Sequence, residues 1–318
     1  MTFRNPPGVP RHIPLWLALA CAAVLTPAPA GAETIIATHP IAPPPLTANT
    51  DILLIQTTPS FSTTQVGLAG APSLSGLAVQ PGTGTVFASS GFGGPNPGSL
   101  FTLNPSTGAA TLVGSTGFGA VPAITFDRNG TLFGSGGVAP TQPFPTAGNT
   151  LITIDPRTGA GHFVGPFGTG IDGMAGLAVD PRTGILYGIG AETPAAPGVF
   201  TNLFTINKQT GAATLLGPLQ GLPDGAAPVG LAFDSAGVLF ASLAGGAGLG
   251  LGPGAGEIGV VNFSNPNNIT FTEVGQAPQG SVSDIGFLVP EPSSLALLAV
   301  GLGAMAGWRR WRKRKAGV

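Results

Sequence analysis

The sequence predicts an all-β fold: a five-bladed β-propeller closed by its N- and C-terminal strands, with a signal helix before it and a transmembrane helix after it. Three observations lead to this prediction. The 318 residues include 52 glycines and 33 prolines, which indicate many turns. Two kinds of hairpin alternate along the chain, and the incomplete units at its two ends complement each other. We therefore expect three regions: a signal peptide at 1–32, the propeller at 33–289 and a sorting segment at 290–318.

The first region has the parts of a secretory signal. Arg4 and Arg11 precede the apolar stretch IPLWLALACAAVL, and small residues follow it. Ala30 and Ala32 satisfy the small-x-small rule for cleavage before Glu33. We therefore expect the exported protein to begin at Glu33.

Lipoprotein processing at Cys21 is the alternative at this end. The leucine that usually stands three places before such a cysteine is here Leu19, one place too close. Cys21 is also the only cysteine of the chain. Cleavage after the signal would leave the exported protein with neither thiol chemistry nor disulfides.

Two hairpin units alternate through the middle of the chain. Each consists of two short runs rich in Val, Ile, Leu, Phe and Thr around a turn cluster. In DPRTG, proline presets φ, the preceding Asp can bond its own backbone, and glycine supplies a positive φ. The first unit reads SGLAVQPGTGTVFA (75–88), PAITFDRNGTLFG (122–134), AGLAVDPRTGILYG (175–188) and VGLAFDSAGVLFA (229–241). The second reads SLFTLNPSTGAATLVG (99–114), TLITIDPRTGAGHFVG (150–165), NLFTINKQTGAATLLG (202–217) and, more loosely, EIGVVNFSNPNNITFTEVG (257–275).

One aliphatic position measures the period of this repeat. Its occupants are spaced by 47, 53, 54 and 54 residues, and they are Leu77, Ile124, Leu177, Leu231 and Ile285. Two hairpins per period make one four-stranded sheet, and a ring of such sheets is a propeller. The chain has neither the WD40 nor the kelch signature.

The two ends of the repeat predict how the ring closes. Residues 50–67 form a second-type hairpin without a first-type unit before it, and residues 283–290 are half of a first-type unit. The segment TIIATHP (34–40) could supply the missing strand. Closure would remove the last free sheet edges, which are otherwise aggregation sites. An open solenoid of stacked hairpins is the structural alternative.

The connections between strands fall on two faces of the ring. The tight turns at 80–84, 104–108, 155–159, 180–184 and 207–211 share one face, and their repetition indicates a structural role. The long, variable loops at 90–99, 135–149, 190–202 and 244–256 share the other, where function is more usual. Four loop carboxylates are candidate ligands for Ca²⁺, namely Asp172, Glu192, Asp224 and Glu257. Solvated loop acids are the alternative reading, and no metal site is assigned.

Composition excludes several function classes. Between Glu33 and Val289 four basic residues stand against twelve acidic ones, so no basic face is available for nucleic acid. His39 and His162 are the only histidines after the signal, and His162 stands where other repeats have threonine. A Ser-His-Asp site therefore has few candidates, and we assign no catalytic residue.

The C-terminal segment has three parts. Pro290, Glu291 and Pro292 precede an uncharged apolar run, which we extend to a transmembrane helix at 293–308. A basic cytoplasmic tail follows at 309–318, containing Arg309, Arg310, Arg312, Lys313, Arg314 and Lys315. A simple tail anchor is one interpretation. The three parts also resemble, in order and spacing, the PEP-CTERM sorting signal of Gram-negative bacteria.

That resemblance implies a route of export and no activity. It implies processing near residues 290–293 by an exosortase, transient contact with the inner membrane, and delivery to the cell surface or an extracellular matrix. Substrates of this kind are typically associated with biofilm and exopolysaccharide. We expect a non-enzymatic propeller that binds a polysaccharide or a matrix protein, without a cofactor unless Ca²⁺ binds. The alternatives are a calcium-dependent hydrolase of the lactonase or glycan type, and a passive matrix component.

Overall fold

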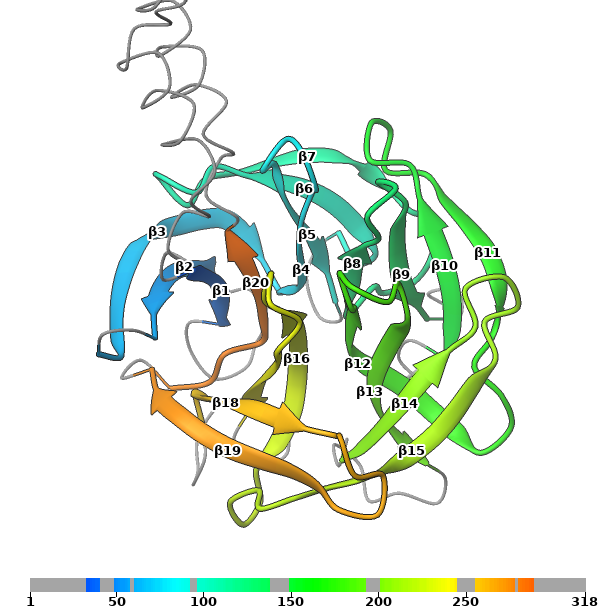
Figure 1. The fold of residues 1–318 in the computed structure, drawn as a ribbon. Coiled ribbons are helices and arrows are strands. Elements are labelled where there is room, and N and C mark those ends of the chain that lie inside the picture. The colour runs from blue at the N-terminus through cyan, green and yellow to red at the C-terminus, as the bar shows by residue number, and fades with distance from the viewer. Residues whose placement is uncertain are drawn as a thin grey trace, which may run out of the picture. The chain divides into compact units, whose positions relative to one another are not determined.

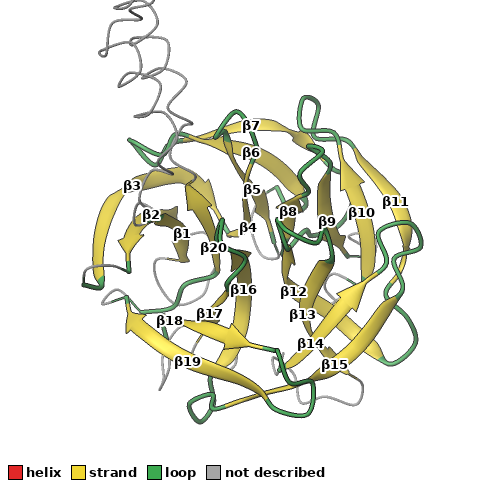
Figure 2. Ribbon diagram, in the orientation of Figure 1, coloured by secondary structure: helices red, strands yellow, loops and turns green. Residues whose placement is uncertain are grey.

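The computed structural model describes residues 33–40, 49–57, 60–91, 96–137, 149–192, 201–244, 255–277 and 280–288. The described residues form strands and turns and contain no helix (Figure 2). Within these ranges no helix is long and apolar enough to cross a membrane. The predicted signal peptide at 1–32 and the sorting segment at 290–318, with its helix at 293–308, lie outside the described residues.

The described residues form twenty strands, which are arranged as five blades of four strands around a central axis (Figure 1). Blade 1 contains β4 (Leu74–Val79), β5 (Val86–Ser90), β6 (Ser99–Leu103) and β7 (Ala110–Ser115). Blade 2 contains β8 (Ile124–Phe126), β9 (Leu132–Gly136), β10 (Thr150–Ile154) and β11 (Gly161–Pro166). Blade 3 contains β12 (Ile171–Val179), β13 (Leu186–Glu192), β14 (Asn202–Ile206) and β15 (Ala213–Gln220). Blade 4 contains β16 (Ala227–Phe233), β17 (Leu239–Ala244), β18 (Glu257–Asn262) and β19 (Ile269–Gln276). A short parallel pairing of β15 with β19 joins blades 3 and 4 into one eight-stranded sheet.

The fifth blade is built from both ends of the propeller, as the sequence predicts. Its order is β20 (Asp284–Leu288), β1 (Thr34–Pro40), β2 (Asn49–Gln56) and β3 (Ser62–Pro72). β20 and β1 are antiparallel, and their register runs from Thr34 opposite Leu288 to Thr38 opposite Asp284. The ring is therefore closed between the first and last described strands, and the open solenoid is excluded. We call this sheet the closing blade.

Each pair of neighbouring blades encloses its own apolar core. Alternate side chains of an inner strand point to opposite sides, because the side-chain period of a strand is two. On β4, Leu77 packs against Ile36 and Ile52 of the closing blade. Its neighbour Ala78 packs against Ile124 of blade 2. Three further clusters fill the interfaces between blades 2 and 3, blades 3 and 4, and blade 4 and the closing blade.

The repeated turns are held by their own side chains. The Oδ1 atom of Asp180 accepts a hydrogen bond of 2.8 Å from the N–H of Arg182, and Gly184 N–H donates to the Asp180 carbonyl at 2.8 Å. Gly184 has a φ of 75°, which favours glycine. Burial acts to raise the pKa of Asp180, but hydrogen bonds from Arg182 and Thr183 outweigh it and hold that pKa below its usual value. The repetition of Asp/Asn-Pro-x-Thr-Gly therefore reflects turn geometry, as expected.

A second glycine of the repeat explains why the blades approach so closely. The glycine that follows a valine on an outer strand faces the Thr-Gly turn of the next blade. A Cβ on Gly114 would lie 2.1 Å from the carbonyl oxygen of Thr158, and one on Gly165 would lie 1.9 Å from that of Thr210. Gly67 of the closing blade meets Thr107 of blade 1 in the same way, at 2.4 Å. Only glycine fits these positions, since no real Cβ contact is that short.

Candidate functional site

The connections divide between two faces of the ring, as the antiparallel order of strands requires. Turns inside the hairpins, such as 80–84 and 234–237, lie on one face, which we call the tight-turn face. The links between hairpins and between blades lie on the other, which we call the long-loop face. The long loops are described only in part, since 92–95, 138–148, 193–200 and 245–254 lie outside the described residues. A binding role for these loops stays a prediction.

A pocket of about 450 Å³ lies at the mouth of the central channel, on the tight-turn face. Its volume is within the range of small-molecule sites. The inner strands of all five blades line it, through residues such as Leu177, Val179 and Ile285. Its rim comes from the first-type turns, including Gln80, Thr83, Pro181 and Ser235. The sequence alone does not indicate this site, because the rim residues are ordinary turn residues that only the ring brings together.

The edges of the inner strands give the pocket polar walls. β4, β16 and β20 each end a blade, so one edge of each has no neighbouring strand within its sheet. Leu77 N–H points away from β5, since it donates to Asp284 at 2.7 Å. Backbone direction alternates along an antiparallel strand, so Val79 also turns its N–H and C=O toward the channel. The same alternation places the backbone groups of Phe233 and Phe287 there, since Leu231 and Ile285 donate to Asp284 in the same way.

Asp284 is buried on the inner strand of the closing blade and bonds to the inner strands of blades 1 and 4. It stands where the other repeats have Gly76, Ala123, Gly176 and Gly230, and it is 0 % exposed. Its carboxyl accepts hydrogen bonds from Leu77 N–H of blade 1 at 2.7 Å and from its neighbour Ile285 N–H at 2.9 Å, and Leu231 N–H of blade 4 adds another. Burial raises the pKa of Asp284 well above its usual value, although all three N–H groups act to lower it. The fold thus places one carboxyl between the two blades that flank the closing blade.

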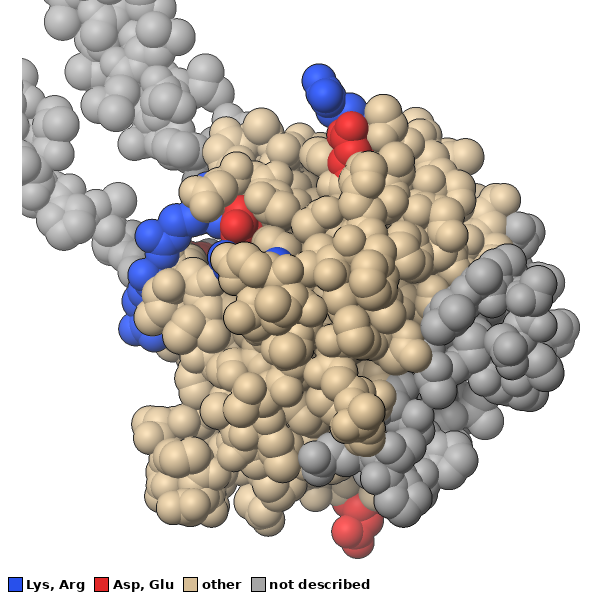
Figure 3. All heavy atoms as spheres, turned by 90° about the vertical axis from the view of Figure 1, so that its right-hand side faces the viewer, with Lys and Arg blue, Asp and Glu red and all other residues tan. Residues whose placement is uncertain are grey.

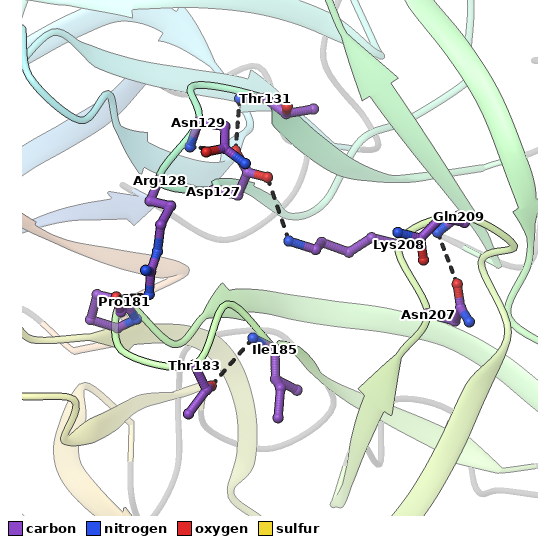
Figure 4. Close-up of polar contacts among 10 residues, drawn as sticks. All are labelled: Asp127, Arg128, Asn129, Thr131, Pro181, Thr183, Ile185, Asn207, Lys208 and Gln209. Carbon is purple, nitrogen blue, oxygen red and sulfur yellow. Dashed lines mark hydrogen bonds and ion pairs between the residues drawn. The ribbon is translucent and has the colours of Figure 1, made fainter.

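Charged side chains at the pocket are few and are held by turn contacts. Arg128 and Asp234 are the ionisable residues among the described ones that line it. The guanidinium of Arg128 donates to the carbonyl of Pro181 in the next blade, as Figure 4 shows. Asp234 accepts from Val238 N–H at 2.7 Å. The rim therefore has one charge of each sign, and neither dominates.

A partly buried ion pair joins the turns of blades 2 and 3 beside this rim. Lys208 Nζ lies 3.5 Å from Asp127 Oδ2, with side-chain exposures of 25 % and 6 % (Figure 4). Asp127 Oδ1 accepts in addition from the N–H groups of Asn129 and Thr131. Lys208 also lies over the ring of Phe133, at 5.8 Å from its centroid. The pair supports the blade interface, and neither residue lines the pocket.

The four predicted calcium ligands lie on the long-loop face. Asp172 is in β12 and Glu192 ends β13, where Ile171 and Glu192 are paired. Asp224 is exposed in the link between β15 and β16. Glu257 begins β18 half-buried, and burial together with Glu273 raises its pKa. Among the described residues no group of three or more His, Cys, Asp or Glu could hold a metal, and the side chains of Asp172 and Glu192 are outside the description. The calcium site stays a prediction.

The two histidines have structural surroundings. His39 is buried in β1, and its Nδ1 donates to the carbonyl oxygen of Ser281 at 2.5 Å. It stands opposite Asp51 of β2, whose Oδ2 accepts from Gln65 Nε2 at 2.8 Å. His162 is exposed on the outer strand β11. Neither position tests the prediction that the protein has no catalytic residue.

Comparison with known proteins identifies the C-terminal signal. Residues 288–314 match the PEP-CTERM protein-sorting motif. The motif implies export, membrane-associated sorting in Gram-negative bacteria and processing by an exosortase. Within the propeller the motif covers only Leu288, the last residue of β20. No curated protein matches the sequence.

Solved structures support the propeller fold. A chain of a nidogen/laminin complex superposes with a TM-score of 0.50 at 13 % identity, covering 81 % of this chain and 98 % of that chain. A gluconolactonase from Xanthomonas campestris gives a TM-score of 0.42 at 15 % identity, with 75 % of each chain covered. At such low identity the first likeness concerns the fold alone, and the second is too distant to support an argument.

Proposed function

We propose that this exported, exosortase-sorted protein acts at the cell surface or in the extracellular matrix, and that its propeller is a binding module for neutral polysaccharide without catalytic activity. The pocket at the channel mouth is the observation that supports this function. It is large enough for a sugar residue, and it is formed by a scaffold closed on itself. We place the binding site there and not in the loop carboxylates.

The chemistry of the pocket favours an uncharged ligand with many hydroxyl groups. Apolar side chains such as Val79 and Phe233 can contact the C–H surface of a sugar ring. The backbone N–H and C=O groups beside them need hydrogen bonds, and a purely apolar ligand would desolvate them without compensation. A charged ligand would find no excess of opposite charge, because Arg128 and Asp234 balance each other. Hydroxyl groups both donate and accept, so they match this mixture.

A binding experiment with a blocked pocket tests the proposal. Titration calorimetry would follow the purified chain with the host's own exopolysaccharide and with free glucose, galactose and N-acetylglucosamine. Ser235→Trp places an indole on the pocket rim, where Ser235 is exposed. We expect this variant to weaken binding at least tenfold. Ser106→Trp is the matched control, since Ser106 is exposed in an outer turn of the same face and does not line the pocket.

Three outcomes contradict the proposal. Undiminished binding by Ser235→Trp would move the site elsewhere, with the long-loop face as the next candidate. Absence of saturable binding to any of these ligands would favour the passive matrix component. Hydrolysis of the polymer by the wild-type chain would favour an enzyme.

A further inference from the structure

The last described strand of the propeller ends beside the pocket. β20 runs along the axis toward the tight-turn face and ends at Leu288, which pairs with Thr34. Gly286 and Phe287, immediately before it, line the pocket. The sorting motif begins at Leu288. The chain that enters the sorting signal therefore leaves the propeller beside the pocket, from its innermost strand.

The connection between them is short. Four residues, Val-Pro-Glu-Pro at 289–292, separate Leu288 from the apolar run that begins at Ser293. From the Cα atom of Leu288 to that of Ser293 the chain takes five steps of at most about 3.6 Å, so the two atoms lie at most roughly 18 Å apart. Two of the four are prolines, which stiffen a linker. While the apolar run is in the membrane, Leu288 at the centre of the tight-turn face must stay within roughly 18 Å of the bilayer.

The two faces also differ in their charged residues. The tight turns contain all four basic residues of the propeller, Arg128, Arg157, Arg182 and Lys208, and their charges are balanced by Asp127, Asp155, Asp180 and Asp234 of the same turns. In Figure 3 the Lys and Arg side chains lie toward the left and upper edges of the described surface, and the outer wall facing the viewer is mostly uncharged. The long-loop face has Asp224 in a connection and Asp172, Glu192 and Glu257 near strand ends, and its connections contain no basic residue that would balance them. Anionic headgroups therefore repel the long-loop face more strongly than the tight-turn face.

We propose that the tight-turn face lies against the anionic phospholipid surface as long as the sorting signal is uncut, so that the membrane covers the mouth of the pocket. A bilayer held within one short tether of the pocket mouth hinders the entry of a polymer. Processing near residues 290–293 removes the tether, and the propeller leaves with its pocket open. Processing then acts as the switch for binding. The consequence for the ligand rests on the proposed function, whereas the orientation of the propeller does not.

Single-cysteine labelling tests the orientation without any ligand. The full chain, with Cys21→Ala, receives either Ser235→Cys at the pocket rim or Asp224→Cys on the long-loop face, both at exposed positions. It is reconstituted in vesicles of phosphatidylethanolamine and phosphatidylglycerol and labelled with a 5-kDa polyethylene glycol maleimide. We expect Ser235→Cys to react at least fivefold more slowly than Asp224→Cys. Insertion of twenty Gly-Ser residues between 289 and 290 is the matched control, and it should bring the two rates within about twofold.

Each result of the labelling experiment either supports or overturns the proposed orientation. Equal rates at the two cysteines in the short-tethered chain would overturn the proposed orientation, as would slow labelling of Ser235→Cys that persists with the long tether. Polysaccharide binding by the released propeller is a separate measurement. Its failure would remove the proposed function and leave the orientation intact, and equal labelling with normal binding would do the reverse.

Discussion

The closing blade and the four internal blades form equivalent sheets, but their inner strands differ at one position. Internal blades have Gly76, Ala123, Gly176 and Gly230 there, and a Cβ on Gly176 or Gly230 would already be within about 3 Å of the next strand. The closing blade has Asp284, whose carboxyl reaches blades 1 and 4. Internal blades are also linked by continuous chain, whereas β20 joins β1 only through strand pairing and packing.

The closing blade also buries more polar groups beside this position. Thr38 Oγ1 accepts from Asp284 N–H at 3.2 Å, and the Thr38 carbonyl accepts from Ser283 N–H at 2.9 Å. His39 and Asp51 are buried a few residues away. Hydrogen bonds therefore supplement apolar packing where the ring has no covalent link. Three predictions test this difference, from the largest effect to the smallest.

Asp284→Ala should weaken the closure most. The variant leaves the N–H groups of Leu77 and Leu231 without their acceptor in a buried site, and each such loss costs about 1–3 kcal/mol. We expect the free energy of unfolding to fall by about 3 kcal/mol, and Tm by roughly 6–12 °C for a domain of this size. Circular dichroism during heating measures the shift. Asp224→Ala, at an exposed turn, is the control, and a loss for Asp284→Ala no larger than the control's would contradict the role of the carboxyl.

The pH dependence of stability sharpens the same comparison. Burial raises the pKa of Asp284 in the folded protein, so folding favours its protonated form. Its contribution is fully present below the unfolded pKa of about 3.9 and is lost as pH rises through the folded pKa. Asp284→Asn cannot titrate there. Between these two values we expect the wild type to lose stability relative to Asp284→Asn by up to about 1.4 kcal/mol per pH unit.

Urea unfolding of both proteins at a series of pH values from 4 upward measures this difference. Taking the difference cancels Glu257, whose pKa is also raised. A constant gap between the two proteins at every pH would mean that Asp284 has the same pKa in both states.

The ion pair between blades 2 and 3 tests an internal interface. Lys208→Met removes the partner of buried Asp127 but keeps most of the packing over Phe133. Asp127 still accepts from two backbone N–H groups, so we expect a loss of about 1 kcal/mol in the free energy of unfolding. Arg157→Met, whose exposed pair with Asp155 lies at 3.8 Å, should show no measurable change in chemical denaturation. A loss for Lys208→Met equal to that of Asp284→Ala would erase the contrast between the interfaces.

Particular residues show how far the sequence could predict the fold. The spacing of Leu77, Ile124, Leu177, Leu231 and Ile285 predicted the five blades, because each blade uses the same hairpins. Thr34–Pro40 was predicted as the missing strand and forms β1 between β20 and β2. The Asp-Pro-x-Thr-Gly turns were predicted to be structural, and Asp180 shows why, since its side chain is used within its own turn.

The candidate site was less predictable. Variable loops and carboxylates directed attention to the long-loop face, whereas the pocket lies on the tight-turn face. Its walls are backbone groups at strand edges, which leave no mark in a sequence. Asp284 was visible as a departure from Gly or Ala in the repeat, and that signal could have drawn attention to the axis.

The sequence by itself determined the route of export, the number of blades and the way the ring closes, because sorting signals, turns and strand periodicity are local patterns. Only the tertiary structure decided where the pocket lies, where the carboxyl of Asp284 is buried and on which face β20 ends. Those features depend on residues from all five blades meeting at one axis, and that meeting follows from the closure of the ring and not from any single segment.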